Sequence, residues 1–182
     1  MNAFREDILL CFRSFGGDPE ESRALLCLAA ERYTKKSGDW TLAFGKKGKP
    51  FFPAMPQVHF SVTHSGRYWM CAFSGQNIGL DLQEHRSCDR RGLSARFFHP
   101  AEDAFLQQRE DAVFFDLWAA KESYVKFTGE GITEGLDYFS VVAPDGRFPC
   151  MEGMWLYPVP WETGYSLCLC AREAGTLTIT QL

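Results

Sequence analysis

Two polar residues in this sequence stand where they could bind a cation. Asp81 and Gln83 belong to the run I-G-L-D-L-Q (residues 78–83), in which apolar and polar residues alternate as along a strand with one buried face. The alternation places both side chains on the face opposite the leucines, so a carboxylate oxygen and an amide oxygen are available to a hard cation such as Mg²⁺. A half-exposed strand with polar residues facing water explains the same pattern equally well.

A second carboxylate lies in a helix that the pattern predicts from about Asp111 to Phe127. Trp118, Glu122 and Lys126 are spaced four residues apart, so their side chains follow one another along one stripe of this helix. The stripe offers a carboxylate to a metal ion and an ammonium group to an anion. However, Glu122 and Lys126 are also an ordinary helix-surface ion pair, and Trp118 could equally belong to the core.

Groups that could bind a phosphate occur earlier in the chain. Thr63 and His64 end a predicted strand before a turn at Ser65-Gly66, where an imidazole, a hydroxyl and backbone N–H groups can hold an anion together. A single histidine more often makes a structural hydrogen bond. The loop Gly45–Pro50 adds three lysines, which are solvated by default and grip a phosphate only if the other groups converge on them. These are Lys46, Lys47 and Lys49.

Strands and helices follow one another in a mixed order, which predicts an α+β fold. Ser74-Gly75-Gln76 is the expected seam between an N-terminal half, residues 1–75, and a C-terminal half, residues 76–182. The expected strands are Ile8–Phe12, Val58–Val62, Tyr68–Phe73, Ile78–Gln83, Phe139–Val142, Met154–Tyr157, Tyr165–Cys170 and Thr176–Ile179. The expected helices are Glu20 to about Tyr33, Arg90–Phe97, a short one after Pro100, and Asp111–Phe127.

Composition limits the classes of protein to which the chain can belong. Its 182 residues, 46% of them hydrophobic, suffice for one domain or two small packed halves. A net charge of -4 argues against broad binding to nucleic acid. No apolar run approaches the roughly 20 residues that span a bilayer, and the first 15 residues lack a signal-peptide pattern. Seven cysteines without a C-x-x-C pair predict reduced thiols, and hence a cytoplasmic protein.

The order of the motifs is more specific than any one of them. A lysine-proline loop precedes F-S-V-T-H-S-G (residues 60–66), which precedes I-G-L-D-L (78–82) and then W-A-A-K-E-S-Y-V-K (118–126). The combination resembles the phosphopantetheinyl transferases of the surfactin-synthetase-activating type, from about Arg23 to Val142. This resemblance implies two similar α+β halves related by a pseudo-twofold axis, with coenzyme A and Mg²⁺ in the cleft between them. It also favours a monomer.

The resemblance further implies a reaction and the residues that perform it. The 4'-phosphopantetheine arm of coenzyme A is transferred to a serine of an apo acyl or peptidyl carrier protein, and 3',5'-adenosine bisphosphate leaves. The implied catalytic residues are Asp81, Glu122 and Lys126; Asp81 and Glu122 bind Mg²⁺ beside Gln83, and Glu122 or a metal-bound water takes the serine proton. The implied coenzyme A contacts are Arg23, Lys49, Thr63, His64, Lys121 and Lys126, with His64 on a phosphate and Lys49 near the adenosine 3'-phosphate.

Two features depart from this pattern. Many relatives carry an acid at the position of Gln83, so Mg²⁺ would keep an extra water here. The N-terminal half is short, and the basic segment with which relatives hold the 3'-phosphate is reduced to Arg5, Arg13 and Arg23. Two other functions are compatible with the sequence. One is a non-catalytic module of the same fold that binds a carrier protein or coenzyme A. The other is an unrelated metal-dependent phosphohydrolase, although the sequence lacks the clustered His and Asp ligands of such enzymes.

Overall fold

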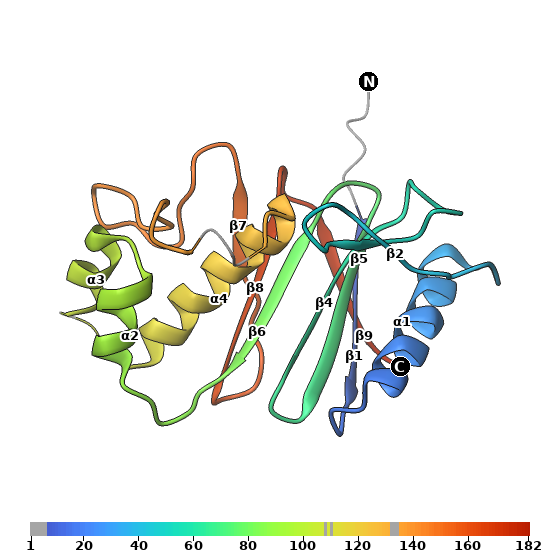
Figure 1. Cartoon of the computed structure of the whole chain (residues 1–182), viewed down its shortest axis with the longest axis horizontal. Coiled ribbons are helices and arrows are strands. Elements are labelled where there is room, and N and C mark those ends of the chain that lie inside the picture. Colours follow the sequence, from blue (N-terminus) through green and yellow to red (C-terminus); the bar gives the residue numbers. More distant parts are fainter. Residues whose placement is uncertain (1–6, 108, 110, 132–134) are drawn as a thin grey trace.

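Two β-sheets lie face to face in the middle of the molecule, and helices cover their outer faces (Figure 1). The computed structural model describes residues 7–107, 109, 111–131 and 135–182, without the side chains of residues 111 and 112. The predicted α+β class is confirmed. Among the described residues, no helix is both long enough and apolar enough to cross a membrane.

The first sheet has four strands in the order β4-β5-β1-β9. Strand β1 (Asp7–Ser14) lies antiparallel to β5 (Tyr68–Ser74) and parallel to β9 (Thr176–Gln181), and β5 pairs with β4 (His59–Ser65). Helix α1 (Pro19–Thr34) covers the outer face of this sheet. The helix begins where the Asp18 carboxylate accepts a hydrogen bond from the N–H of Glu20.

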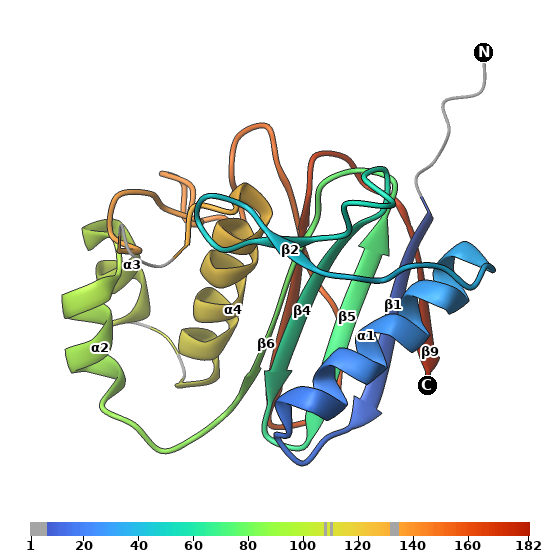
Figure 2. The same cartoon turned by 45° about the vertical axis from the view of Figure 1, so that its right-hand side comes forward.

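The second sheet has three antiparallel strands in the order β6-β8-β7, namely β6 (Gly79–Glu84), β8 (Tyr165–Ala171) and β7 (Trp155–Pro158). The long helix α4 (Asp111–Thr128) lies across its outer face, and α2 (Arg90–Phe97) and α3 (Pro100–Leu106) pack beyond it (Figure 2). The short strands β2 (Ala43–Phe44) and β3 (Pro50–Phe51) form a separate hairpin, and the predicted lysine loop is its turn.

The apolar faces of the two sheets meet in a shared core. Alternation along each strand supplies this core, because every second side chain points inward. Leu10 and Met70 contribute from the first sheet, and Leu80 and Leu167 contribute from the second. The predicted boundary between residues 75 and 76 stays a prediction. Strand β9 nevertheless lies in the sheet of the N-terminal strands, although it follows that boundary in the sequence.

The predicted strand Phe139–Val142 is wrong, because these described residues adopt bends instead. Their polar backbone groups are satisfied by other partners. The N–H of Val141 donates to Glu102 Oε1 on α3 at 2.7 Å, and the N–H of Val142 donates to Ser140 Oγ at 3.1 Å. Val141 and Val142 are buried against α4, so their apolar character reflects burial in a loop rather than a place in a sheet.

Gly79 allows α4 to approach β6 closely. A Cβ atom at this position would lie 1.9 Å from the carbonyl oxygen of Ser123 and 2.6 Å from the backbone nitrogen of Phe127. Both atoms belong to the helix backbone and cannot rotate away, so only glycine fits. The close approach brings the side chains of β6 and α4 together.

We therefore expect Gly79→Ala to lower the free energy of unfolding by about 3 kcal/mol, because α4 must move off the sheet. Urea denaturation followed by circular dichroism measures this change. Gly16→Ala is the matched control, since a Cβ atom at Gly16 meets nothing within 4 Å. Equal stability of the two variants would show that the position of α4 against β6 does not require a glycine at residue 79.

Candidate active site

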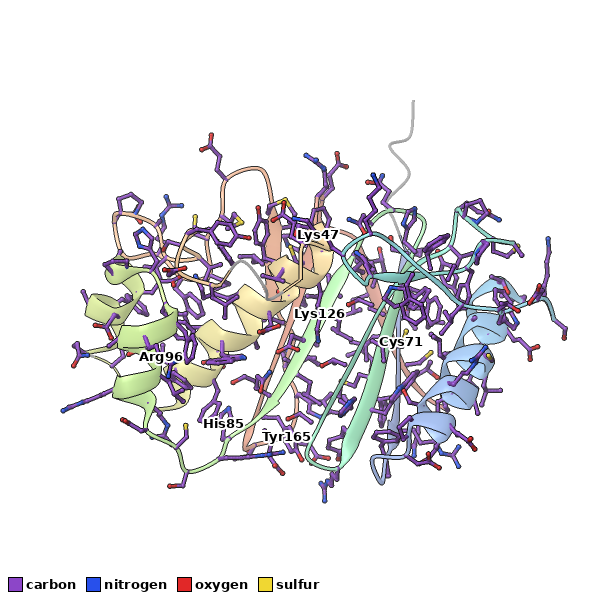
Figure 3. The ribbon with its side chains drawn as sticks, viewed as in Figure 1. Lys47, Cys71, His85, Arg96, Lys126 and Tyr165 are labelled. Atoms are coloured by element: carbon purple, nitrogen blue, oxygen red, sulfur yellow. The ribbon has the colours of Figure 1, made fainter. Side chains whose placement is uncertain are left out.

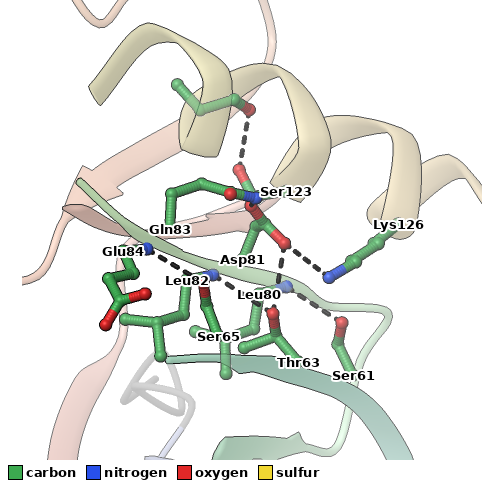
Figure 4. Close-up of polar contacts among 11 residues, drawn as sticks. Ser61, Thr63, Ser65, Leu80, Asp81, Leu82, Gln83, Glu84, Ser123 and Lys126 are labelled. Atoms are coloured by element: carbon green, nitrogen blue, oxygen red, sulfur yellow. Dashed lines mark hydrogen bonds and ion pairs between the residues drawn. The ribbon is translucent and has the colours of Figure 1, made fainter. Parts of the chain in front are cut away.

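Strands β4 and β6 lie side by side where the two sheets meet, and side-chain hydroxyls join them (Figure 4). Every second residue of β4 accepts a hydrogen bond from a backbone N–H of β6. The pairs, with the N–H donor first, are Leu80–Ser61 at 2.9 Å, Leu82–Thr63 at 3.2 Å and Glu84–Ser65 at 2.9 Å. The hydroxyls replace the carbonyl acceptors of an ordinary strand pair, so β6 is held in register beside β4.

Asp81 occupies the middle of this join and is 3% exposed. Its Oδ1 accepts hydrogen bonds from Lys126 Nζ at 2.6 Å and from Thr63 Oγ1 at 3.1 Å. Its Oδ2 accepts a hydrogen bond from Gln83 Nε2 at 2.7 Å. The carboxylate is therefore oriented by three neighbours from β4, β6 and α4, all of which Figure 4 shows.

Glu122 enters the same site from α4 and is 6% exposed. The pKa of its carboxyl is raised to about 7, mainly by burial and next by the negative charge of Asp81, while the positive charge of Lys126 opposes the shift. Asp81 is therefore close enough to act electrostatically on Glu122, and Lys126, one helical turn after Glu122, donates a hydrogen bond to Asp81.

The two carboxylates fit a Mg²⁺ ion. Placing two buried acids together is unfavourable unless a cation compensates them, and Mg²⁺ binds one or two carboxylates while keeping several waters. Gln83 directs its Nε2 toward Asp81 in this arrangement. In the described part of the chain, no three His, Cys, Asp or Glu side chains converge as a metal-binding group.

A cavity of about 360 Å³ opens beside Glu122. Three lysines line it together with apolar side chains of β3, β4 and α4, so its wall can neutralise an anion and also contact an apolar chain. The lysines are Lys47, Lys49 and Lys126, and the apolar residues are Pro50, Phe60, Val62 and Val125. Figure 3 shows Lys47 and Lys126 at the same end of α4.

Lys49 is tied to the second sheet and its helix. Its Nζ donates to Asn77 Oδ1 at 2.5 Å, to the carbonyl of Ile78 at 3.2 Å and to the carbonyl of Phe127 at 3.0 Å. Burial lowers the pKa of Lys49 to about 8. Sequence reasoning missed Asn77, which also donates to the Phe127 carbonyl, since an asparagine at a strand start resembles a simple turn residue.

The other predicted contacts of coenzyme A are dispersed. Thr63 is buried and bonds to Asp81, whereas His64 is exposed on the opposite face of β4, with its ring 5.5 Å from the ring of Phe15. Arg23 is exposed on α1, on the far side of the first sheet, and acts electrostatically on Cys27. Thr63 and His64 lie apart because neighbouring residues of a strand point to opposite faces of the sheet.

Lys121 does not reach the site, which corrects its expected contact with phosphate. Its side chain is fully buried among α3, α4 and the 139–142 loop. Its Nζ lies 2.6 Å from Glu102 Oε2 and donates to the Phe139 carbonyl at 2.6 Å. A residue next to Glu122 in the sequence points about 100° away around the helix, so the two cannot share one stripe.

Comparison with known proteins identifies the superfamily to which this chain belongs. A family model described as "4'-phosphopantetheinyl transferase superfamily" matches residues 77–173, which include Asp81 and Glu122. The chain belongs to this superfamily, and the resemblance noted in its sequence is confirmed.

Particular relatives narrow this assignment to the Sfp type. A 4'-phosphopantetheinyl transferase of Bacillus subtilis is 32% identical over 159 residues, covering 80% of this chain and 69% of that protein. The 4'-phosphopantetheinyl transferase Sfp of Bacillus subtilis (strain 168) is 30% identical over 158 residues, covering 79% and 68%. The 4'-phosphopantetheinyl transferase gsp of Aneurinibacillus migulanus is 35% identical over 149 residues, covering 74% and 60%.

We expect Lys121→Met to lower the free energy of unfolding by about 3–5 kcal/mol, because it leaves the buried Glu102 carboxylate without its partner. Lys36→Met, at an exposed position, is the control and should change stability little. Urea denaturation measures both variants. A stable Lys121→Met protein with weakened coenzyme A binding would instead support a phosphate contact.

The raised pKa of Glu122 also predicts a pH dependence of stability. Because this pKa is higher in the folded protein than the ordinary 4.5, the folded state binds the proton more tightly. The free energy of unfolding should then fall as pH rises from about 4.5 to about 7, by about 3 kcal/mol.

Glu122→Gln should remove this loss, so the variant should be more stable than the wild type at pH 8 and similar to it at pH 4. Urea denaturation with a chelator present measures both. Glu152→Gln, at an exposed position, should keep the wild-type dependence. A Glu122→Gln protein that is no more stable at pH 8 would contradict the electrostatic description of the site.

Proposed function

We propose that this chain transfers the 4'-phosphopantetheine moiety of coenzyme A to a serine of an apo acyl or peptidyl carrier protein. Membership of the superfamily and similarity to proteins named 4'-phosphopantetheinyl transferase support this activity. The structural observation that carries the proposal is the pair formed by Asp81 and Glu122, with Lys126 hydrogen-bonded to Asp81. This pair stands beside a cavity whose wall combines lysines with apolar side chains.

Asp81 and Glu122 would hold a Mg²⁺ ion, which would supply positive charge to the pyrophosphate of coenzyme A. Lys126 would neutralise phosphate oxygens from the α4 side, and Lys47 would do so from the hairpin. Lys49 would add positive charge to the cavity wall, while its Nζ stays hydrogen-bonded to Asn77 and to the carbonyls of Ile78 and Phe127. Transfer of a phosphoryl group builds negative charge on the bridging and equatorial oxygens, and fixed positive charges stabilise it. Thr63 and Gln83 would keep the Asp81 carboxylate in one orientation through their hydrogen bonds.

Glu122 would act as the general base. Burial and the charge of Asp81 raise the pKa of Glu122 to about 7 when no cation is bound, and a bound Mg²⁺ would lower this pKa, so Glu122 would meet the serine as an ionised carboxylate. The serine oxygen would bond to the β-phosphorus as its proton passes to Glu122. The bond from this phosphorus to the bridging oxygen would break, and 3',5'-adenosine bisphosphate would leave with that oxygen.

The finer architecture belongs to the same proposal. Each sheet carries one long helix on its outer face, α1 on the first and α4 on the second, which is consistent with two halves related by a pseudo-twofold axis. The N-terminal half would be residues 1–75, and the C-terminal half would be residues 76–182, with β9 returning to the first sheet. We further propose that the protein acts as a monomer.

Intact-mass measurement tests the function directly. The protein is incubated with coenzyme A, MgCl₂ and each member of a panel of apo acyl and peptidyl carrier proteins. We expect a carrier to gain the mass of phosphopantetheine, since only a transferase can attach it covalently. Binding of coenzyme A without a mass gain would instead support the non-catalytic module, and release of nucleotide without a carrier would support a phosphohydrolase.

Variants in the same assay separate the roles of the three polar residues. Asp81→Ala and Glu122→Ala should each abolish transfer, because each removes a proposed Mg²⁺ ligand. Gln83→Ala should slow transfer only severalfold, because Gln83 orients Asp81 through one hydrogen bond. Equal loss of activity in all three variants would show that the assignment of ligands is wrong.

A further inference from the structure

Residues 43–51 form what we call the lysine hairpin, which consists of β2, β3 and the turn that carries Lys46 and Lys47. Among the described strands, β2 and β3 pair only with each other, so strand pairing does not attach the hairpin to either large sheet. Figure 1 and Figure 2 both show it beside the C-terminal end of α4. Side-chain contacts are therefore left to hold it in this place.

Lys49 makes such a contact with the end of α4. Its ammonium group has three N–H donors, and Asn77 Oδ1, the carbonyl of Ile78 and the carbonyl of Phe127 accept all three. Phe127 is the next-to-last residue of α4, where helix carbonyls lack partners within the helix and a positive charge is favourable. Lys49 thus caps α4 from the hairpin, and its three donors are already used.

Asn77 connects the two ends of this contact. Its Oδ1 accepts from Lys49 at 2.5 Å, and its Nδ2 donates to the same Phe127 carbonyl that Lys49 binds. Asn77 stands two residues before β6, so it bridges the hairpin and the helix from a backbone that the second sheet holds. The stem of Lys49 packs over Gly129, where a Cβ atom would lie 3.1 Å from Lys49 Cδ. We call Asn77, Lys49 and the Phe127 carbonyl the asparagine clamp.

The asparagine clamp lies at the partition between two cavities. One is the lysine-lined cavity of about 360 Å³, and the other has a volume of about 350 Å³. Lys49, Pro50 and Phe60 line both, so these residues form the wall between them. Asn77 lines the second cavity alone. A ligand in the lysine-lined cavity would therefore touch the wall that Asn77 holds, without touching Asn77 itself.

We propose that Asn77 is a positioning residue for the binding of coenzyme A, because it holds the Lys49 ammonium on the end of α4 and thereby fixes the hairpin wall of the lysine-lined cavity. This inference rests on the proposed function for the identity of the ligand. With the clamp closed, Lys47 of the hairpin and Lys126 of α4 line one cavity. With the clamp open, the hairpin would move away from α4, and a bound phosphate would lose the charge of Lys47.

The neutral side chain of Asn77 separates this role from a direct electrostatic one. Replacing Asn77 by another neutral residue leaves the charges of Lys47, Lys49 and Lys126 unchanged, and Asn77 is outside the wall of the lysine-lined cavity. A weaker affinity for an anion would then follow from the position of the hairpin. Substitution of Lys49 alone cannot make this distinction, because it also removes a charge.

Hydrogen–deuterium exchange of the free protein measures how firmly the hairpin is held. We expect the amides of residues 43–51 to exchange at least about tenfold faster in Asn77→Ala and in Asn77→Leu, because each variant removes a hydrogen bond to a charged group. Asn77→Leu keeps nearly the volume of the native side chain, so an effect that both variants share belongs to the lost hydrogen bonds. In a Lys49→Met background, Asn77→Ala should add less than about twofold, because both substitutions open the same clamp.

Titration calorimetry with coenzyme A and MgCl₂ measures the consequence for binding. Both Asn77 variants should bind coenzyme A at least about fivefold more weakly, whereas turnover at saturating coenzyme A should stay within about twofold of the wild type. Gln76→Ala is the matched control, since Gln76 is the exposed neutral amide next to Asn77 and lines neither cavity. It should match the wild type in exchange and in affinity.

Unchanged exchange of the hairpin in both Asn77 variants, or faster exchange with unchanged coenzyme A affinity, would overturn the proposal. A wild type that does not bind coenzyme A would overturn it as well. If the wild type binds coenzyme A and the variants weaken this binding, but no carrier protein gains mass, the positioning role is supported and the transfer reaction alone is refuted.

Discussion

The site depends on the hydrogen bonds between the hydroxyls of β4 and the backbone of β6. Ser61, Thr63 and Ser65 each accept from an N–H of β6, so two separate sheets meet along strands whose register is fixed. Thr63 has a second task, since its hydroxyl also donates to Asp81. A hydroxyl can do both because it is a donor and an acceptor at once. The contact that joins the sheets therefore also orients the acid at their junction.

The opposing side of the site is fixed by close packing and by a buried ion pair. Gly79 lets the backbone of α4 come against β6, and the buried pair of Lys121 and Glu102 holds the other side of the helix. Between these constraints, Glu122 has little freedom to move away from Asp81. The pKa of Glu122 is raised mainly because the carboxyl is buried there, and next because Asp81 is near. A cation that binds both acids would relieve the repulsion between them.

Sequence patterns predicted the elements whose periodicity is strong, including β6, α1 and α4. In the structure, β6 and α4 place Asp81, Glu122 and Lys126 near one another. They failed where two environments produce the same residue types. Val141 and Val142 are apolar in a buried loop as they would be in a strand. Lys121 carries a charge that suggests an anion site, yet its partner Glu102 lies far away in the sequence. Such tertiary partners leave no local signal, and neither does the role of Asn77 beside Lys49.

The return of the chain to its first sheet has a kinetic consequence. Strand β9 pairs in parallel with β1, so Asp7 lies opposite Thr176 at nearly the full separation that the sequence permits. Bringing β9 to β1 closes a loop of most of the chain, and the chain loses this conformational entropy before the strands can pair. Folding is slower when a topology depends on such long-range pairing. The open side of β1 would meanwhile offer unpaired backbone groups to other chains. Aggregation during folding is therefore a hazard that this arrangement creates, and early pairing of β1 with β5 leaves only one such edge exposed.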